Sequence, residues 1–332
     1  MKFFIAAAQN TLFPRYFPEK ILSQLREMGE VELNPHDRPM TREELARALA
    51  DTDILITHWG TPQVDAEMLA HAPRLKLLAH AAGTVAHIAS EACYAQGIPV
   101  LSANPIMAKY VAENVLCDLL AMMHTVPQHD DALRQGCWDK RYDQQHTLFG
   151  AKIGVIGMGA VARNLMALLR PFGCSVAVYD PFLPENGLAQ WDFCRRVSFE
   201  EAMGQPIVSI HAAQTPETFH LINARALSLM PDGGILVNTA RGSLVDTDAL
   251  IAELQTGRIS AALDVYEQEG AGRQPQALLD CRENTVLQPH AGATAVTWEM
   301  THGIVDDVRR FQAGQPLQLR VSLAQYRLMT QE

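Results

Sequence analysis

Short apolar segments alternate with helical patterns along most of this chain, and this alternation limits its possible folds more than any other feature. The expected strands cover residues 3–8, 54–57, 75–79, 153–156, 176–179, 207–211, 235–238, 261–265 and 285–288. Strands separated by helices form βαβ units, because the chain crosses over before it re-enters the sheet in the same direction. The sequence therefore predicts an α/β fold with doubly wound parallel sheets.

The expected strands fall into two sets, separated by a helical pattern over residues 112–125 and a polar segment over residues 127–146. At 332 residues the chain is long enough for two domains, each with a core of its own. We therefore expect two α/β domains, with the polar segment projecting from one of them as an arm.

Composition and charge argue against several classes of partner. The chain has 37 acidic and 27 basic side chains, whereas surfaces that hold nucleic acid or anionic lipid need a surplus of Lys and Arg. Residues 1–8 are too few for a signal-peptide core, and Asp118 interrupts the best apolar helical run, so no membrane span is expected. The six cysteines form no CxxC pair and no Cys/His group at metal spacing, which predicts a reducing, cytoplasmic setting and no metal.

A glycine-rich turn, Gly-Met-Gly-Ala-Val-Ala from Gly157 to Ala162, links the expected strand 153–156 to a helix. Gly157 allows the tight turn, Gly159 lets the backbone approach a pyrophosphate, and Ala162 lets the helix pack closely on the strand. The helix amino terminus then offers N–H groups to the phosphates. The turn residues Gly157, Met158 and Gly159 are therefore predicted to bind a dinucleotide.

Asp180 ends the next expected strand, some 20 residues after the glycines. A carboxylate at this position accepts hydrogen bonds from the adenosine ribose hydroxyls and repels a 2′-phosphate, so the predicted cofactor is NAD rather than NADP. An Asp before Pro181 also suits a plain strand-end turn.

Three further segments place titratable residues directly after expected strands. Arg241 follows strand 235–238, and Glu267 and Glu269 follow strand 261–265. His290 follows strand 285–288 in Gln-Pro-His-Ala-Gly. The carboxyl ends of strands form the edge where an open α/β sheet binds ligands. Taken alone, each residue also fits an ordinary role, as a hydrogen-bonded His, a surface ion pair or a solvated Glu.

Together these segments resemble the D-isomer-specific 2-hydroxyacid dehydrogenases, the family of phosphoglycerate, glycerate, hydroxypyruvate and formate dehydrogenases; the resemblance runs in order from about residue 82 to 293. It implies an active site of Arg241, Glu269 and His290, with Glu269 preferred to Glu267 because of its five-residue step from Asp264. It also implies NAD contacts at Ala160, Val161, Asp180, His211, Thr215, Thr239, Ala240, Arg241, Asp264 and His290.

The reduction of a 2-keto acid explains why Arg241, Glu269 and His290 would act together. The reaction needs a hydride on carbon, a proton on oxygen and a group that binds the carboxylate. His290 is the natural proton donor, because imidazole titrates nearest to neutral pH. Glu269 would stabilise the imidazolium, and Arg241 would bind the carboxylate and polarise the carbonyl. The resemblance therefore implies an NAD-dependent enzyme that interconverts a small 2-keto acid and its D-2-hydroxy acid.

The segment from His80 to Val85 resembles the glycine-containing substrate loop of the family. The resemblance implies that Ala82, Gly83 and Thr84 bind the substrate carboxylate together with Arg241 and His290; a simple strand-ending turn is the other interpretation. The sequence departs from the family pattern here, because the segment is one residue short near Val85. It departs again after Glu269, where Gly270 replaces the usual Pro.

The resemblance implies a Rossmann NAD-binding domain of residues 105–291 inserted into a flavodoxin-like substrate (catalytic) domain of residues 1–104 and 292–332. Trp138 and Tyr142 in the polar arm predict a two-fold homodimer, since both side chains gain from burial at an interface.

Two other functions are compatible with a dinucleotide turn. Some relatives of the family act as NAD(H)-sensing corepressors with little turnover. Dehydrogenases of L-hydroxy acids or amino acids share the turn, but they are not expected to carry Arg241, Glu269 and His290 in these contexts. The sequence does not name the particular 2-keto acid.

Overall fold

A computed structural model describes residues 1–138, 140 and 146–330 of the chain and divides it into two compact units. Unit 1 comprises Met1–Met107 and Thr294–Glu332, and unit 2 comprises Ala108–Ala293. The chain therefore leaves unit 1 to form unit 2 and then returns. Within the described residues, no helix combines the length and the apolar character that crossing a membrane requires.

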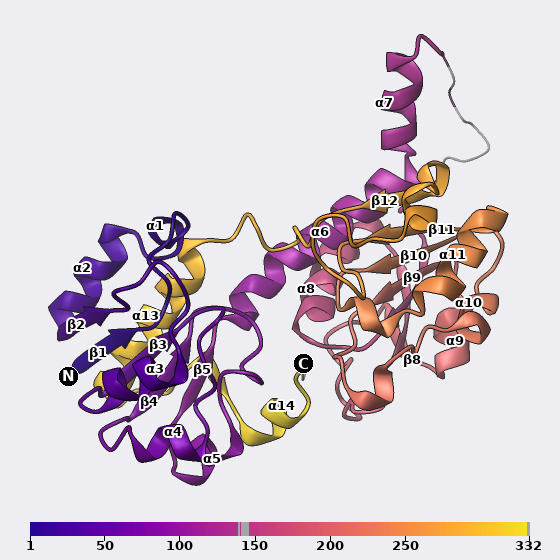
Figure 1. The fold of residues 1–332 in the computed structure, drawn as a ribbon. Coiled ribbons are helices and arrows are strands. Elements are labelled where there is room, and N and C mark those ends of the chain that lie inside the picture. The colour runs from indigo at the N-terminus through magenta and orange to yellow at the C-terminus, as the bar shows by residue number, and fades with distance from the viewer. Residues whose placement is uncertain (139, 141–145, 331–332) are drawn as a thin grey trace. The chain divides into compact units, whose positions relative to one another are not determined.

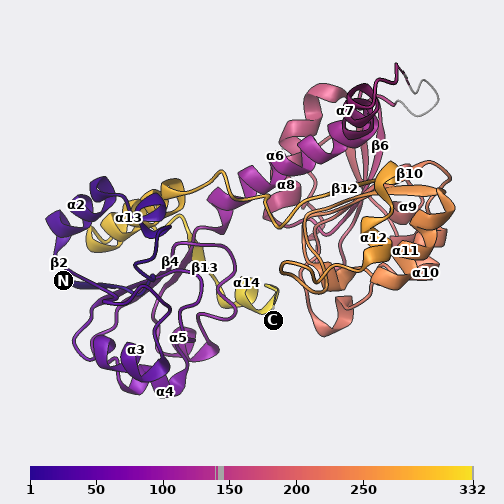
Figure 2. The same cartoon turned by 45° about the horizontal axis from the view of Figure 1, so that its top comes forward.

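Unit 1 contains a six-stranded sheet in the order β13-β5-β4-β3-β1-β2 (Figures 1 and 2). All neighbouring strands are parallel except β13, which pairs antiparallel with β5. The strand order β2-β1-β3-β4-β5 is that of a flavodoxin-like, doubly wound domain, as predicted. The strands are β1 (Lys2–Ile5), β2 (Glu30–Leu33), β3 (Ile54–Thr57), β4 (Leu77–His80), β5 (Val100–Ser102) and β13 (Arg320–Val321).

Helices cover both faces of this sheet: α2 and α13 lie on one face and α3, α4 and α5 on the other (Figure 2). The helices of this unit are α1 (Phe13–Tyr16), α2 (Glu19–Met28), α3 (Arg42–Leu49), α4 (Ala66–Ala70), α5 (Glu91–Ala95), α13 (Trp298–Gln312) and α14 (Leu323–Arg327). Helix α6 (Asn104–Met123) begins here and continues into unit 2.

Unit 2 contains a seven-stranded parallel sheet in the order β12-β11-β10-β9-β6-β7-β8. The order reverses between β9 and β6, as in a Rossmann fold, so the predicted architecture is confirmed. The strands are β6 (Lys152–Ile156), β7 (Ser175–Tyr179), β8 (Cys194–Arg196), β9 (Ile207–Ile210), β10 (Gly234–Asn238), β11 (Ile259–Leu263) and β12 (Thr285–Leu287). The helices are α7 (Val126–Arg134), α8 (Ala160–Leu169), α9 (Phe199–Met203), α10 (Ala224–Ser228), α11 (Thr247–Thr256) and α12 (Gln276–Leu279).

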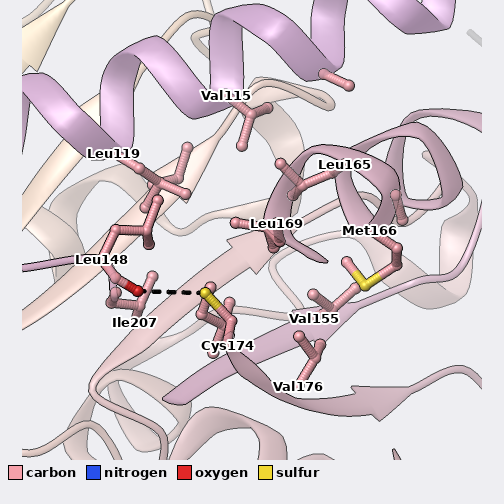
Figure 3. Packing of buried hydrophobic residues seen from close by; sticks show 14 of the residues in the cluster. Val115, Leu119, Leu148, Val155, Leu165, Met166, Leu169, Cys174, Val176 and Ile207 are labelled. Atoms are coloured by element: carbon pink, nitrogen blue, oxygen red, sulfur yellow. Dashed lines mark hydrogen bonds between the residues drawn. The ribbon is translucent and has the colours of Figure 1, made fainter. Parts of the chain in front are cut away.

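The core of unit 2 has two apolar layers, one on each face of the sheet. On one face, Val115 and Leu119 of α6 and Leu165 and Leu169 of α8 are fully buried against the strands (Figure 3). On the other face, residues of α9, α10 and α11 form a second buried cluster. Burial on both faces explains why the central strands read as continuous apolar runs. Because all these strands run parallel, their carboxyl ends lie along one edge of the sheet.

Four strands were not predicted, because their sequences carry no long apolar run. β2 (Glu-Val-Glu-Leu) and β8 (Cys-Arg-Arg) form edges and are half-exposed, while β5 and β13 have three and two residues. The long helix was expected over residues 112–125, yet α6 begins at Asn104. In the predicted arm, α7 stands away from the sheet (Figure 1).

Candidate active site and dinucleotide site

The glycine-rich turn lies between β6 and α8, and its backbone requires glycine at the first position. Gly157 has a φ of +91°, and a Cβ there would lie within 2.8 Å of the backbone of Ala212. A Cβ on Gly159 would meet only the His211 carbonyl oxygen, at 3.9 Å, so the space beside this residue is open. No side chain caps the amino terminus of α8. The turn therefore offers N–H groups and room to an anionic group such as a pyrophosphate.

Asp180 directly follows β7 and faces this turn. One carboxylate oxygen accepts a hydrogen bond from the Met158 N–H at 2.8 Å, and the other accepts one from the Phe182 N–H at 2.8 Å. The carboxylate is half-exposed, so both oxygens retain acceptor capacity for ribose hydroxyls. Asp180 thus stands at the position where an adenosine ribose binds in this fold.

The other predicted cofactor residues in unit 2 follow neighbouring strands. His211 follows β9, donates its backbone N–H to Ile156, and has a ring nitrogen 2.8 Å from the Ser209 hydroxyl. Desolvation lowers the pKa of His211 to about 4, so the ring is neutral at neutral pH. The buried hydroxyl of Thr239, after β10, has no hydrogen-bond partner among the described residues. Such a donor fits a polar ligand at this edge.

Asp264 is fully buried at the end of β11 and holds the segment that carries His290. Its carboxylate accepts hydrogen bonds from the N–H groups of Ala291 at 2.5 Å and Gly292 at 2.9 Å, and its carbonyl oxygen accepts the His290 N–H at 2.8 Å. Burial raises the pKa of Asp264, although the two N–H bonds counteract part of this effect. These contacts fix the backbone of His290, which has a φ of +54°, an uncommon conformation for a residue other than glycine.

Glu269 and His290 are brought together by the structure. The His290 Nδ1 atom lies 2.9 Å from a Glu269 carboxylate oxygen, and both side chains are about half exposed. A carboxylate on Nδ1 stabilises the imidazolium and leaves Nε2 available for a substrate oxygen. This is the geometry that a general acid/base requires.

Glu267, the other acidic candidate in this segment, has different partners. Its carboxylate accepts hydrogen bonds from the Thr247 N–H at 3.0 Å and the Thr247 hydroxyl at 2.6 Å, and it lies 3.3 Å from the His220 ring. The Thr247 and His220 contacts lower the pKa of Glu267, against the effect of desolvation. Its place is therefore at the start of α11, apart from His290.

Arg241 lies in the turn after β10. One terminal nitrogen donates to the Ala240 carbonyl oxygen at 2.8 Å, and the buried Nε atom has no hydrogen-bond partner among the described residues. Among the described residues, no carboxylate lies within ion-pair distance of the Arg241 guanidinium. Arg241 also forms no hydrogen bond to Glu269 or His290 there. A half-buried guanidinium with spare donors can bind a planar carboxylate.

In unit 1, Ala82, Gly83 and Thr84 follow β4, and the first two are buried. The Ser102 hydroxyl donates to the Gly83 carbonyl oxygen, while the N–H groups of these three residues have no acceptor among the residues that the structure describes. Consecutive unpartnered N–H groups suit an anion. Asn114, Asp118 and Gln288, which the sequence did not single out as a site, form a hydrogen-bonded group near Asp264, with Asp118 buried and both amides half-buried. The only sequence signal was a charge within an apolar helix.

The described residues contain no group of three or more His, Cys, Asp or Glu side chains suited to hold a metal ion. The open space at Gly159 and the unpartnered Thr239 hydroxyl instead fit a dinucleotide at the carboxyl edge of the sheet in unit 2. Fold and site together define an NAD-binding α/β protein of the oxidoreductase class.

Comparison with known proteins identifies the family. Residues 116–292 match the NAD-binding domain of the D-isomer-specific 2-hydroxyacid dehydrogenases, and the chain belongs to this family. It is 34% identical over 291 residues to glyoxylate reductase of Thermofilum pendens, a match that covers 85% of this chain and 84% of the relative. NAD is the cofactor of the matched domain.

Two further similarities bear on fold and length. D-3-phosphoglycerate dehydrogenase of Methanocaldococcus jannaschii is 32% identical over 297 residues, which cover 86% of this chain and 54% of that protein. The chain thus spans about half the length of several curated relatives that it matches. The solved D-lactate dehydrogenase of Aquifex aeolicus, in complex with NAD and lactic acid, has a TM-score of 0.71 at 24% identity, covering 95% of this chain and 96% of that one. This last likeness concerns the fold.

Proposed function

We propose that this protein is an NAD-dependent D-2-hydroxyacid dehydrogenase that interconverts a small 2-keto acid and its D-2-hydroxy acid. The observation that carries the proposal is the His290–Glu269 pair, with Nδ1 and the carboxylate oxygen 2.9 Å apart, after β12 of an NAD-binding domain.

Each residue of the proposed site has a defined task. His290 protonates the substrate oxygen during reduction and removes the proton during oxidation, while Glu269 stabilises its charged form. Arg241 binds the carboxylate and stabilises negative charge on the carbonyl oxygen. Bound NADH supplies the hydride. In unit 1, the unpartnered N–H groups of residues 82–84 suit an anion such as a carboxylate.

The cofactor contacts of the proposal follow the strand ends of unit 2. Asp180 binds the ribose hydroxyls, and the amino terminus of α8 with the turn before it binds the pyrophosphate. The proposed contacts are Gly157, Met158, Gly159, Ala160, Val161, Asp180, His211, Thr215, Thr239, Ala240, Arg241, Asp264 and His290.

A panel of 2-keto acids tests the proposal. Glyoxylate, hydroxypyruvate, pyruvate and phenylpyruvate are each mixed with NADH and the purified protein, and the absorbance of NADH is followed. At least one should be reduced, and chiral chromatography should identify a product with the D configuration. NADH binding without turnover of any keto acid would favour the sensing function, and an L product would overturn the stereochemical assignment.

We further propose a homodimer formed through the arm. Leu133 and Val126 on the projecting helix α7 are 57% and 53% exposed, and Trp138, which follows this helix, is 81% exposed. Tyr142, also expected to contribute, lies outside the described residues. Light scattering should report twice the mass of the chain, and Trp138→Ala should weaken the association. We also propose a cytoplasmic location, which six cysteines without disulfides support.

A further inference from the structure

Asp118 is a buried carboxylic acid on an apolar helix. It lies on α6 with only 1% of its surface exposed, and the buried residues of the same helix around it include Val115, Leu119 and Met122. Among the described residues it forms no ion pair, and its partners are two neutral amides. An acid that is buried without a cation is costly, so its presence calls for a physical role.

The stronger partner of Asp118 belongs to the segment that carries the proposed acid. The Gln288 side-chain amide donates to one Asp118 oxygen at 2.6 Å, and the Asn114 side chain donates to the other at 3.3 Å. The backbone N–H of Gln288 donates to Leu263 at 2.8 Å. Gln288 is therefore fixed from two sides, by its backbone to β11 and by its side chain to α6, two residues before His290.

The same segment is held beyond His290 by Asp264, through Ala291 and Gly292. His290 has an unfavourable φ of +54°, so its backbone needs support on both sides. Asp264 holds the backbone after His290, through Ala291 and Gly292. Asp118 holds the segment before His290, through the side chain of Gln288.

We propose that Asp118 is a positioning residue for the acid/base His290 and acts on it through the side chain of Gln288. The proposal rests on the proposed function only for the role of His290; the anchoring itself is a property of unit 2. Asp118 is buried and acts through Gln288, without contact to substrate or cofactor. Its task is to hold the Gln288–Pro289–His290 turn so that the imidazole meets Glu269.

The ionisable surroundings of Asp118 make this anchor sensitive to its charge. Its neighbours are the neutral Asn114 on its own helix and Gln288 after β12, together with the ionisable Asp264 and Tyr266 after β11. Burial, and then the nearby Asp264 charge, raise the pKa of Asp118 to about 7. A charged acceptor makes a stronger hydrogen bond than a neutral one, so the anchor should tighten as pH rises through neutrality.

Three variants test the anchor. Asp118→Leu removes the acceptor but suits the apolar surroundings, Asp118→Asn keeps an acceptor without the charge, and Gln288→Leu removes the donor. Met122→Ala serves as the matched control, because it disturbs the same helix one turn later and is no partner of Gln288. Melting temperatures establish that all four variants fold.

The first readout does not depend on activity. The His290 imidazole is followed by NMR in ¹³C-histidine-labelled protein and assigned by its loss in His290→Ala. In Asp118→Leu and Gln288→Leu the signal should shift and broaden, and in Met122→Ala it should stay at its wild-type position. In Asp118→Asn the signal should keep its wild-type position, because the Asn side chain still offers Gln288 an acceptor. An unchanged His290 signal in both leucine variants would overturn the proposal, whether or not the protein reduces keto acids.

The second readout is kinetic. Asp118→Leu should lower kcat about tenfold, within the loss of up to ~10²-fold that a small misplacement of a catalytic group causes. The Kd for NADH should change less than twofold, and Asp118→Asn should recover most of kcat. Equal kcat losses in Asp118→Leu and Met122→Ala would overturn the proposal, because a general loosening of the core would then explain both. Absence of turnover in the wild-type protein would instead overturn the proposed function and leave the NMR result to decide the anchor.

Discussion

Each unit contains a doubly wound sheet, yet the histidines at the carboxyl edges of the two sheets have opposite surroundings. In unit 1 the edge contains His58 and His80, with exposed fractions of 7% and 0%. Burial lowers the pKa of His58 to about 4 and that of His80 to about 3. In unit 2 the edge carries His290, which is half exposed and paired with Glu269. Two doubly wound sheets thus carry a buried, neutral histidine at one edge and a half-exposed histidine paired with a carboxylate at the other.

The comparison shows that solvent access and a charged neighbour, rather than residue type or place in the fold, decide what a strand-end histidine can do. We therefore expect substitutions at the edge of unit 2 to change chemistry with little effect on stability. Substitutions of the buried rings in unit 1 should change stability above all.

The largest expected effect is that of His290→Ala. Loss of a positioned general acid should lower kcat for keto-acid reduction by about 10²–10⁴-fold, while the melting temperature stays near the wild-type value because the side chain is half exposed. Steady-state kinetics with NADH measures the first and calorimetry the second. His146→Ala, at an exposed histidine of unit 2, is the control, and near-normal turnover in His290→Ala would contradict the assignment.

Arg241→Ala should lower kcat/KM by about 10²-fold, the usual cost of removing one donor that stabilises developing charge. KM for the keto acid should rise and kcat should fall together, since the guanidinium both binds the carboxylate and polarises the carbonyl. NADH affinity, from fluorescence without substrate, should change far less. Arg241→Lys should recover only part of the loss, because an ammonium cannot form the bidentate pair. A variant that changes NADH affinity alone would place Arg241 in the cofactor site only.

The buried rings of unit 1 should make the protein sensitive to acid. Above pH 6.5 both rings are neutral in the folded and unfolded chain, and their full contribution to stability is present. As pH falls below 6.5, both rings become protonated in the unfolded chain but stay neutral in the folded protein. The free energy of unfolding should therefore drop by about 2 kcal/mol per ring by pH 5.

Urea denaturation at pH 7 and pH 5 measures this loss. His80→Asn cannot be protonated and can still bond the Thr57 hydroxyl, which lies 2.9 Å from His80 Nδ1, so its stability should depend less on pH. An equal pH dependence in the variant and the wild type would show that the His80 ring is charged or solvated in the folded protein.

Asp180 provides a test at the cofactor. The wild-type protein should prefer NADH over NADPH by at least about tenfold, or ~1.4 kcal/mol, because the carboxylate repels a 2′-phosphate. Asp180→Ser should narrow this ratio in kcat/KM while turnover with NADH persists. Equal use of both cofactors by the wild-type protein would show that Asp180 does not select NADH over NADPH.

The smallest expected effect is that of Glu269→Gln. The variant keeps the shape of the pair with His290 but removes the charge that favours the imidazolium. The pH above which keto-acid reduction declines should therefore move downward, with a smaller loss of rate at low pH. Glu267→Gln is the control, because Glu267 bonds to Thr247 rather than His290. If the pH profile shifted in Glu267→Gln and not in Glu269→Gln, Glu267 rather than Glu269 would be the partner of His290.

Local sequence determined much of this protein. Apolar runs specify the central strands because both faces of those strands are buried, and the glycines at 157 and 159 specify the turn because a side chain either collides there or blocks the approach of a ligand. The order of these signals was sufficient to predict the two sheets and the family. It also located the strand ends at which Asp180, Arg241 and His290 stand.

Only the tertiary structure decided the contacts between distant segments. The sequence did not predict the edge strands β2 and β8. These strands form by pairing with one neighbour rather than by burial, so they carry no apolar run. Asp118 and Gln288 are 170 residues apart, and a charge within an apolar helix does not reveal its partner. The low pKa of His80 also depends on burial that the fold creates, because the free energy of a charge is set by its surroundings and not by its position in the chain.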